Sequence, residues 1–302
     1  MISNKIFFCM LALFLAAGTA GAATLNVGQG QTYSTIQSAI DASETGDVIS
    51  VSEGTYYENV VLTKSGIAIM GKNKEKTIID GQKTGSVIRI ETNDVTISGF
   101  TIRNNGGSGK EDAGVSLYNA NNNMIANSIF VNNTAGIAIY SSSNNNVIAG
   151  NYIRSNGRYG INVFSSLDNK IYGNQIQQNQ IGIYADSARG YQIYLNNFID
   201  NTIDHAYDNS GKNAWDDGKS GNYWSNYKGS APFKIKGGAN AVDNYPLSGA
   251  VTIKDVAISI PTPVKTQGQN TQEEAKKSTP GFEVLSVIAV IGILGYGAGH
   301  KR

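Results

Sequence analysis

Carboxylates are the first side chains to test for chemistry, because hydrolysis of a glycosidic bond needs two of them across a cleft. Asp216 and Asp217 form the only adjacent aspartate pair in the chain. Between Val115 and Asn201 no repeat unit carries two acidic residues aligned with two more in the next unit. The carboxylates therefore identify no catalytic residue, and they favour a protein that is not an enzyme.

A second candidate set recurs at one position of a repeated pattern: glycine, apolar residue, any residue, apolar residue. On a strand the two apolar side chains point inward, so the intervening and following side chains point outward. Outward rings in successive strands about 4.8 Å apart would form an exposed ladder, against which the C–H faces of sugars pack. We predict that the following residues bind carbohydrate, with the alternative that they only stabilise the fold or lie under a loop. They are Tyr118, Tyr140, Phe164, Asp186 and Asp208.

These residues must be positioned by a repeat of 22 to 24 residues that runs from Gly114 to Asn201. Each unit is too small to bury its own apolar face, and its three short apolar segments are separated by Asn, Gly and Ser. This pattern is typical of strands and turns, and it predicts an all-β fold, a single right-handed parallel β-helix. Two asparagine columns keep the same period, and we expect their amides to hydrogen-bond from turn to turn. The columns are Asn127, Asn151, Asn174, Asn196 and Asn132, Asn156, Asn179, Asn201.

Both ends of the solenoid need a cap, because open strand edges and an open core are exposed there. Residues 34–42 form the one convincing amphipathic helix, with Ile36, Ala39 and Ile40 on one face and Ser34 or Thr35 able to cap its start. From about residue 205 the repeat gives way to a segment with both tryptophans. We predict a β-helix domain over residues 24–248 that contains both caps. A glycine-rich loop at residues 106–112 is expected to be a passive insertion.

The two ends of the chain indicate export and attachment. Residues 1–23 have the basic, apolar and small-residue parts of a signal peptide. Residues 249–279 are predicted to be a polar spacer. Residues 280–302 resemble the archaeal Pro-Gly-Phe type of sorting signal, which implies a sorting enzyme and a membrane as partners; a plain membrane anchor is the alternative. A net charge of +1 gives no reason to expect nucleic acid, and Cys9 is the only cysteine.

Two stretches carry a resemblance to known families. Residues 46–60 resemble the opening strands of the pectin-lyase-like superfamily, and the segment around Trp215–Gly218 and Gly221–Ser225 resembles the NosD-like family of exported β-helix proteins. The resemblance implies a cell-surface β-helix protein, and we expect it to bind or scaffold envelope polysaccharide or glycan without catalysis. Because the superfamily contains lyases, esterases and hydrolases, a polysaccharide lyase or glycoside hydrolase is the alternative. A purely structural envelope protein is the second alternative.

The NosD-like resemblance also implies that copper binding must be tested, because bacterial members of the family assist assembly of a copper centre. Copper prefers Met, His and Cys ligands, and outside the predicted signal peptide the chain has only Met70, Met124, His205 and His300. We expect both methionines in the core and His300 in the sorting signal. His205 follows Val115, Ile137, Ile161 and Ile183 in one column of the repeat, so we expect it at the edge of the core. The sequence therefore predicts no metal site and no cofactor.

Overall fold

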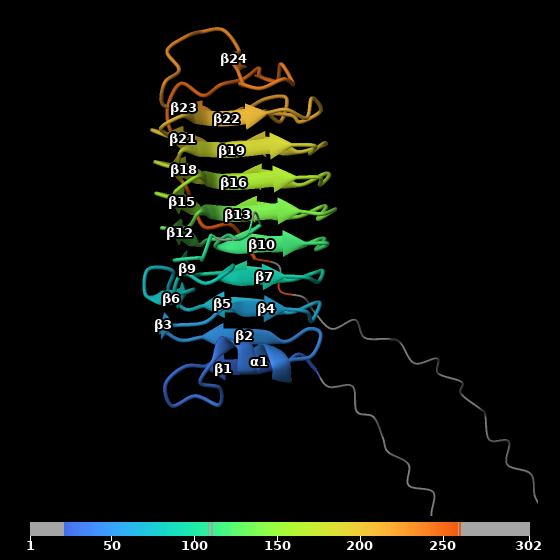
Figure 1. Cartoon of the computed structure of the whole chain (residues 1–302), viewed down its shortest axis with the longest axis vertical. Coiled ribbons are helices and arrows are strands. Elements are labelled where there is room, and N and C mark those ends of the chain that lie inside the picture. Colours follow the sequence, from blue (N-terminus) through green and yellow to red (C-terminus); the bar gives the residue numbers. More distant parts are fainter. Residues whose placement is uncertain (1–20, 108, 110, 259, 261–302) are drawn as a thin grey trace, which may run out of the picture. The chain divides into compact units, whose positions relative to one another are not determined.

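The computed structural model describes residues 21–107, 109, 111–258 and 260, which form a right-handed parallel β-helix of about nine turns (Figure 1). This confirms the predicted fold. The first sheet, called sheet A here, contains β1 (Thr24–Val27), β2 (Val48–Val51), β5 (Ala68–Gly71), β8 (Thr96–Ser98), β11 (Met124–Ala126), β14 (Val147–Ala149), β17 (Lys170–Tyr172) and β20 (Gln192–Tyr194).

Two further parallel sheets complete each turn of the solenoid. Sheet B contains β3 (Gly54–Tyr56), β6 (Thr77–Asp80), β9 (Thr101–Arg103), β12 (Ile129–Val131), β15 (Tyr152–Arg154), β18 (Gln175–Gln177), β21 (Asn197–Ile199) and β23 (Tyr223–Trp224). Sheet C contains β4 (Val60–Leu62), β7 (Ile88–Ile90), β10 (Val115–Tyr118), β13 (Ala135–Tyr140), β16 (Tyr159–Phe164), β19 (Ile181–Asp186) and β22 (Asp204–Asp208).

Columns of isoleucine fill the interior, one side chain per strand. Ile125, Ile148, Ile171 and Ile193 are fully buried in sheet A, and each such side chain contributes roughly 1.5–3 kcal/mol. In sheet B the buried Phe130 continues the column, and it pairs with Ile102 on one side and Ile153 on the other. Ile129 lies beside it and is only half-buried, so the neighbouring residue, and not Ile129, fills the core.

A glycine precedes the inward residues of each regular strand in sheet C because successive backbones approach closely there. A Cβ atom on Gly136 would lie 2.8 Å from the carbonyl oxygen of Gly160, and one on Gly160 would lie 2.6 Å from that of Gly182. Real Cβ atoms do not approach so near. The recurring glycine that reveals the repeat in the sequence is therefore a packing requirement of this sheet.

Asparagine ladders run along three corners of the solenoid. Asn151 Nδ2 donates to Asn174 Oδ1 at 3.0 Å, and Asn156 Nδ2 donates to Asn179 Oδ1 at 3.0 Å, each ladder continuing in the turns on either side. The third ladder joins Asn123, Asn146 and Asn169, and no column predicted from the sequence contained it. The amides of these ladder asparagines also donate to main-chain carbonyls, as Asn151 does to Ile125, so most buried polar groups at the corners are paired; Asn105 Nδ2, at the start of the second ladder, is the exception among the described residues.

Two members of the predicted asparagine columns lie outside the ladders. Ser128 occupies the ladder position next to Asn151, and Asn133 occupies the position next to Asn156. Asn127 and Asn132, one residue earlier, adopt left-handed backbone angles at the corners, with φ of 50° and 57°. When two polar residues are adjacent only one can face inward, and strand pairing selects the second of each pair.

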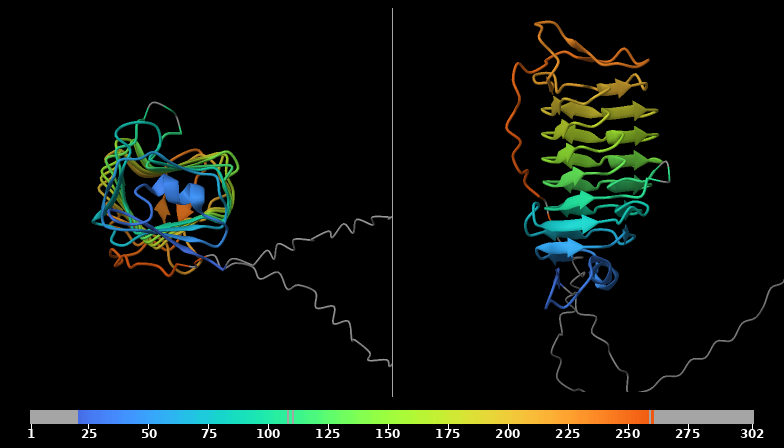
Figure 2. Two further views of the ribbon diagram at one scale, coloured as in Figure 1. Left: turned by 90° about the horizontal axis from the view of Figure 1, so that it is seen from below. Right: turned by 60° about the vertical axis from the view of Figure 1, so that its left-hand side comes forward.

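The predicted capping helix is confirmed, and aromatic rings close the other end of the solenoid. Helix α1 (Ile36–Ala42) lies across the first turns (Figure 2), and Thr35 Oγ1 caps it by accepting from the Ser38 amide at 3.2 Å. At the other end, the ring of Trp224 stacks between those of Phe198 and Phe233 at centroid distances of 4.3 and 4.2 Å. The antiparallel pair β24 (Phe233–Lys234) and β25 (Val242–Asp243) completes this cap.

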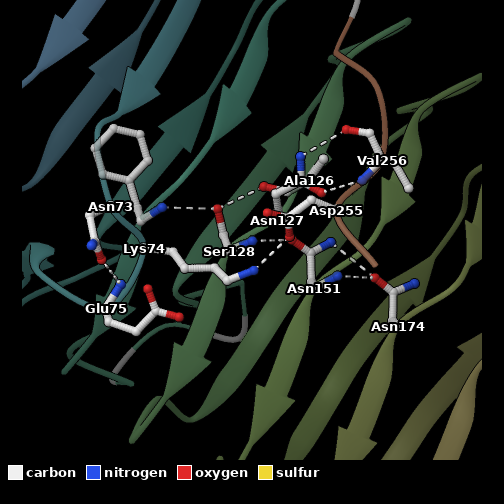
Figure 3. A network of polar contacts seen from close by, with 11 residues as sticks. Asn73, Lys74, Glu75, Ala126, Asn127, Ser128, Asn151, Asn174, Asp255 and Val256 are labelled. Atoms are coloured by element: carbon white, nitrogen blue, oxygen red, sulfur yellow. Dashed lines mark hydrogen bonds and ion pairs between the residues drawn. The ribbon is translucent and has the colours of Figure 1, made fainter. Parts of the chain in front are cut away.

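Residues 249–258, which we call the return segment, run back along the outside of the solenoid (Figure 2, right). Asn197 accepts from the Val251 amide at 2.9 Å and donates to its carbonyl at 2.7 Å. Asn127 holds Val256 in the same way at 2.8 and 3.0 Å (Figure 3), and Lys74 pairs with Asp255 at 2.6 Å. The first ten residues of the predicted polar spacer are therefore packed against the body.

The predicted signal peptide up to residue 20, most of the spacer and the predicted sorting signal lie outside the described residues. Within the described ranges, no helix is long and apolar enough to cross a membrane.

Candidate functional site

The outer face of sheet C carries a group of tyrosines on three consecutive strands. Tyr159 in β16 and Tyr184 in β19 have ring centroids 5.3 Å apart with planes tilted by 37°. The rings of Tyr184 and Tyr207 in β22 are 5.5 Å apart and nearly parallel at 8°. We call these three the tyrosine row. They stabilise one another, since each aromatic pair contributes about 0.5 to 1.5 kcal/mol.

A groove of about 530 Å³ lies between this face and the loop at residues 106–112. Tyr140, Tyr159, Tyr184 and Phe164 supply its rings. Its polar groups come from both sides: Glu111 and Asp112 from the loop, Arg158 and Asn162 from the sheet. The glycine-rich loop is thus one wall of the groove, whereas the sequence led us to expect a passive insertion.

Tyr140 lies at the bottom of the groove and is only 7% exposed. Its hydroxyl accepts a hydrogen bond from Asn162 Nδ2. Burial, together with the negative charge of Glu111, raises the pKa of Tyr140 to about 12. The phenol is therefore protonated near neutral pH, and it cannot act there as a base.

Arg158 provides the positive charge at the sheet side of the groove. Its guanidinium carbon lies 4.8 Å from the ring centroid of Tyr159, in cation–π contact. This contact orients the guanidinium while leaving the side chain exposed. Arginine donors can bond sugar hydroxyl or carboxylate oxygens while the adjacent ring faces pack against sugar C–H groups.

The structure places four of the five predicted binding residues in one outward column. Tyr118 pairs with Tyr140, and Phe164 pairs with Asp186. The predicted continuous exposed ladder is nevertheless wrong, because Tyr140 is buried in a cluster with Tyr159, and Arg89 packs over the ring of Tyr118, 5.3 Å from its centroid. Phe164 is the one ring of the three that is substantially exposed, at 45%.

Asp208, the fifth predicted residue, points into the solenoid. It pairs with Ala185 instead of following Asp186 in the outward column, and its side chain is fully buried. Its carboxylate accepts from Trp215 Nε1 at 3.0 Å and from the Ser210 amide at 2.8 Å. The last strand is shifted by one residue relative to the predicted alignment, and the shift turns this side chain inward. Asp208 is therefore part of the C-terminal cap.

Tyr159, Tyr184 and Tyr207 were missed by the sequence analysis, although a signal for two of them was present. Tyr184 occupies the intervening position of its repeat unit, which also points outward, and Tyr207 pairs directly with it. Tyr159 precedes the repeated glycine and pairs with Ala135. The tyrosine row therefore spans two outward positions, so a search along one column could not find it.

His205, Ser225 and Asp200 form a hydrogen-bonded series at the C-terminal cap. His205 Nε2 lies 3.3 Å from Ser225 Oγ, and this hydroxyl donates to Asp200 Oδ1 at 3.2 Å. The Asn201 amide oxygen is already bonded by Asn179, so its NH₂ group faces His205 Nδ1 at 3.2 Å. Nδ1 is thus an acceptor, and the proton on Nε2 points at the serine. In this tautomer His205 cannot take the proton of Ser225, so the series is not arranged for nucleophilic catalysis.

Copper ligands are not assembled in the described part of the chain. It contains no group of three or more His, Cys, Asp or Glu side chains that could hold a metal ion, and both ring nitrogens of His205 have partners. Met70 and Met124 are half-buried on the outer face of sheet A, which corrects their predicted place in the core. They lie on β5 and β11 with β8 between them, and they pair with Ser98 and Thr96 respectively. This donor set does not fit a copper site.

Comparisons with known proteins place the chain among solenoid proteins. Residues 17–229 match the family described as periplasmic copper-binding protein (NosD). A pectin methylesterase from Yersinia enterocolitica has a similar structure, with a TM-score of 0.51 and 12% identity over 72% of this chain and 94% of that one. At this identity the similarity shows a shared fold alone.

Two sequence relatives match shorter segments. A mannuronan C5-epimerase from Pseudomonas putida is 31% identical over 155 residues, which cover 47% of this chain and 27% of the epimerase. A cell surface glycoprotein from Methanothermus fervidus is 35% identical over 101 residues, or 32% of this chain and 16% of the glycoprotein. The chain thus spans about a quarter or less of the length of these relatives.

Proposed function

Since the chain belongs to the NosD family of periplasmic copper-binding proteins, we propose that it is an exported β-helix protein that binds a cell-envelope glycan in the groove on sheet C. The family description supports a location outside the cytoplasm, as does similarity to a cell surface glycoprotein. Similarity to a mannuronan C5-epimerase supports a polysaccharide as ligand. Copper forms no part of the proposal, because the described side chains do not fit it.

The observation that carries the proposal is the composition of the groove. Rings from two neighbouring strands, those of Tyr159 and Phe164 in β16 and of Tyr184 in β19, lie beside hydrogen-bonding groups on Asn162 and Arg158. A sugar presents an apolar C–H face and a rim of hydroxyl groups, so it needs ring faces and polar groups side by side. Binding sites commonly combine apolar walls with a few convergent polar groups in this way.

Binding without catalysis is favoured by where the carboxylates lie. Glu111 and Asp112 are neighbours on the loop side, and no other carboxylate lines the groove among the described residues. Glycoside hydrolysis needs a second carboxyl group opposite the first. Elimination needs a base, and the raised pKa of Tyr140 keeps its phenol protonated near neutral pH.

The enzyme alternative, a polysaccharide lyase or glycoside hydrolase, keeps one supporting observation: a relative is named as an enzyme that acts on mannuronan. Incubating the purified chain with mannuronan, alginate, pectin and neutral envelope glycans separates the proposals. We expect no released sugar, no unsaturated product and no change in uronate configuration. Turnover that Tyr140→Phe abolishes would establish the enzyme instead.

The binding test compares two tyrosine pairs of similar geometry. Tyr184 stacks on Tyr207 in the groove face, and Tyr194 stacks on Tyr172 on sheet A with centroids 5.4 Å apart. On a glycan array followed by calorimetry, Tyr184→Ala should weaken binding at least tenfold and Tyr194→Ala should leave it unchanged. Equal effects of the two substitutions, or no glycan binding by the wild-type chain, would support the purely structural envelope protein.

We also propose that the chain is held at the cell surface through residues 280–302. The proposal rests on the sequence of these residues alone, because they lie outside the described part of the chain. Deleting them should release the protein into the medium. A truncated chain that stayed with the membrane fraction would contradict attachment through this segment.

A further inference from the structure

We propose that Asn132 is a site of N-glycosylation. The chain has 33 asparagines, and only Asn132, in the sequence Asn132-Asn133-Thr134, stands two residues before a serine or threonine with a residue other than proline between. This is the acceptor pattern for asparagine-linked glycans in exported proteins. The inference shares the exported location with the proposed function, but it does not depend on glycan binding in the groove.

The backbone exposes Asn132 at a corner of the solenoid. It lies directly after β12, with a left-handed φ of 57°, and its amide nitrogen bonds the carbonyl of Ser155 at 3.3 Å. Its side chain is exposed, and it makes no hydrogen bond to any other residue that the structure describes. The side-chain nitrogen to be modified, Asn132 Nδ2, is therefore accessible, while the main chain of this residue is held in place.

The side-chain amide of the adjacent Asn133, by contrast, is buried and hydrogen-bonded, and so it is not accessible to modification. Asn133 is 3% exposed, and its Nδ2 donates to the carbonyl of Ile102 at 3.0 Å and to Asn156 Oδ1 at 3.2 Å. Modifying Asn133 would break the ladder, whereas a glycan on Asn132 would displace no existing bond. Of two neighbouring asparagines, one holds the solenoid together and the other is free to react.

The reaction requires a sugar donor of the lipid-phosphate class, with the glycan joined through C1 to the phosphate oxygen. Asn132 Nδ2 forms a bond to C1, the bond between C1 and the phosphate oxygen breaks, and the amide loses one proton. The lipid-linked phosphate leaves. Thr134, which is half-buried, supplies the hydroxyl that the acceptor pattern requires.

The modification would lie close to the proposed binding groove. A second hollow, of about 490 Å³, is lined by Asn132, Thr134, Gly106 and Arg158. Thr134 and Arg158 also line the groove on sheet C. A glycan attached at this corner would therefore stand at the rim of the groove, on the side of the loop.

The test is mass spectrometry of peptides from the full chain, made in a host that glycosylates a co-expressed reference glycoprotein. We expect the peptide with Asn132 to carry added sugar mass. Asn132→Gln and Thr134→Val should abolish it, and Thr134→Ser should keep it. An unmodified Asn132 peptide beside a modified reference protein would overturn the proposal, as would sugar that persists on this peptide in Thr134→Val.

Asn145 offers a matched control in the next turn. It has the same left-handed φ of 57°, is exposed, and precedes the ladder residue Asn146. It lacks the acceptor pattern because Val147 follows Asn146, so the wild-type peptide should be unmodified. Val147→Thr should bring a glycan to Asn145 if an exposed corner with the pattern is sufficient. Modification of Asn145 in the wild type would show that the pattern does not select the site.

Discussion

Asn201 Nδ2 lies 3.2 Å from Nδ1 of His205, so one of the asparagine ladders ends on a histidine. The direction of the ladder determines the tautomer. Each amide oxygen accepts from the preceding asparagine, and each NH₂ group is left to donate onward, so the final partner must be an acceptor. Neutral His205 meets this requirement, and a protonated ring does not.

This relationship predicts how stability depends on pH. Burial lowers the pKa of His205 below the ordinary value of a histidine, and the charges of Asp200 and Asp204 only partly offset this effect. The unfolded chain therefore takes up a proton before the folded chain does. Stability should fall as pH drops below about 6.5, by up to about 1.4 kcal/mol per pH unit from this group. Urea unfolding of wild type and His205→Gln between pH 7.5 and 5 measures the difference, and identical slopes would contradict it.

A substitution within a ladder should be far more costly than one at an exposed corner. Asn156 donates to Phe130 and Asn179, and it accepts from the amide and the side chain of Asn133. Asn156→Ala leaves several buried groups unpaired, each worth about 1–3 kcal/mol, so we expect a loss of at least about 3 kcal/mol. Asn145→Ala breaks no buried hydrogen bond, and it should cost only about 1–2 kcal/mol, because alanine tolerates the left-handed φ of 57° less well than asparagine. Similar losses would mean that the ladders contribute little.

Asp208 and Asp186 were predicted to play the same role, and they should behave oppositely. Asp208→Ala removes the buried acceptor of Trp215 Nε1 and of the Ser210 amide. We expect the free energy of unfolding to fall by about 3 kcal/mol or more. Asp186→Ala should cost under about 0.5 kcal/mol, because the side chain lies on the outer surface. Thermal unfolding followed by tryptophan fluorescence measures both, and an equal cost would show that Asp208 does not hold the cap.

Phe164 and Tyr140 share a column but differ in exposure, so their substitution should separate binding from stability. Phe164→Ala should weaken glycan binding while the melting temperature changes little, because the ring is 45% exposed. Tyr140→Ala removes a buried ring, and it should lower the melting temperature by several degrees. The two variants are compared by calorimetry and thermal scans. If Phe164→Ala lost much stability and kept its glycan binding, the ring of Phe164 would stabilise the fold and take no part in binding.

The return segment should depend on the two asparagines that hold it. Asn127 and Asn197 bond the backbones of Val256 and Val251. In the double variant Asn127→Ala, Asn197→Ala, amide hydrogens of Val251 and Val256 should exchange about tenfold faster, since each lost bond contributes about 0.5–1.5 kcal/mol. Amides of the core strands should keep their rates. Unchanged exchange at both valines would show that other contacts hold the segment.

The architecture could be predicted from the sequence because it depends on properties that repeat. The recurring glycine, isoleucine and asparagine positions define the length of a turn and the number of strands. The period is read from several units, so one irregular unit does not hide it. The capping helix and the tryptophan-rich cap were also recognisable, since each ends the repeat with a local pattern of its own.

Side-chain orientation at single positions was decided by the tertiary structure. Asn132 and Asn133 are chemically identical neighbours, and pairing with the next turn alone determines which of them enters the ladder. The same one-residue ambiguity misplaced Asp208, because a shift of one position exchanges the two faces of a strand.

The candidate groove depended on contacts between segments distant in the sequence. The column with Tyr140 and Phe164 was predicted as outward, but Tyr140 is buried against Tyr159, and loop residues such as Glu111 form a wall of the groove that no repeat encodes. The tyrosine row draws on two outward positions of successive strands. The sequence alone determined the solenoid and its period, because burial of a repeated apolar pattern has one periodic solution. Only the folded chain decided which outward rings remain accessible, because that depends on what packs against them.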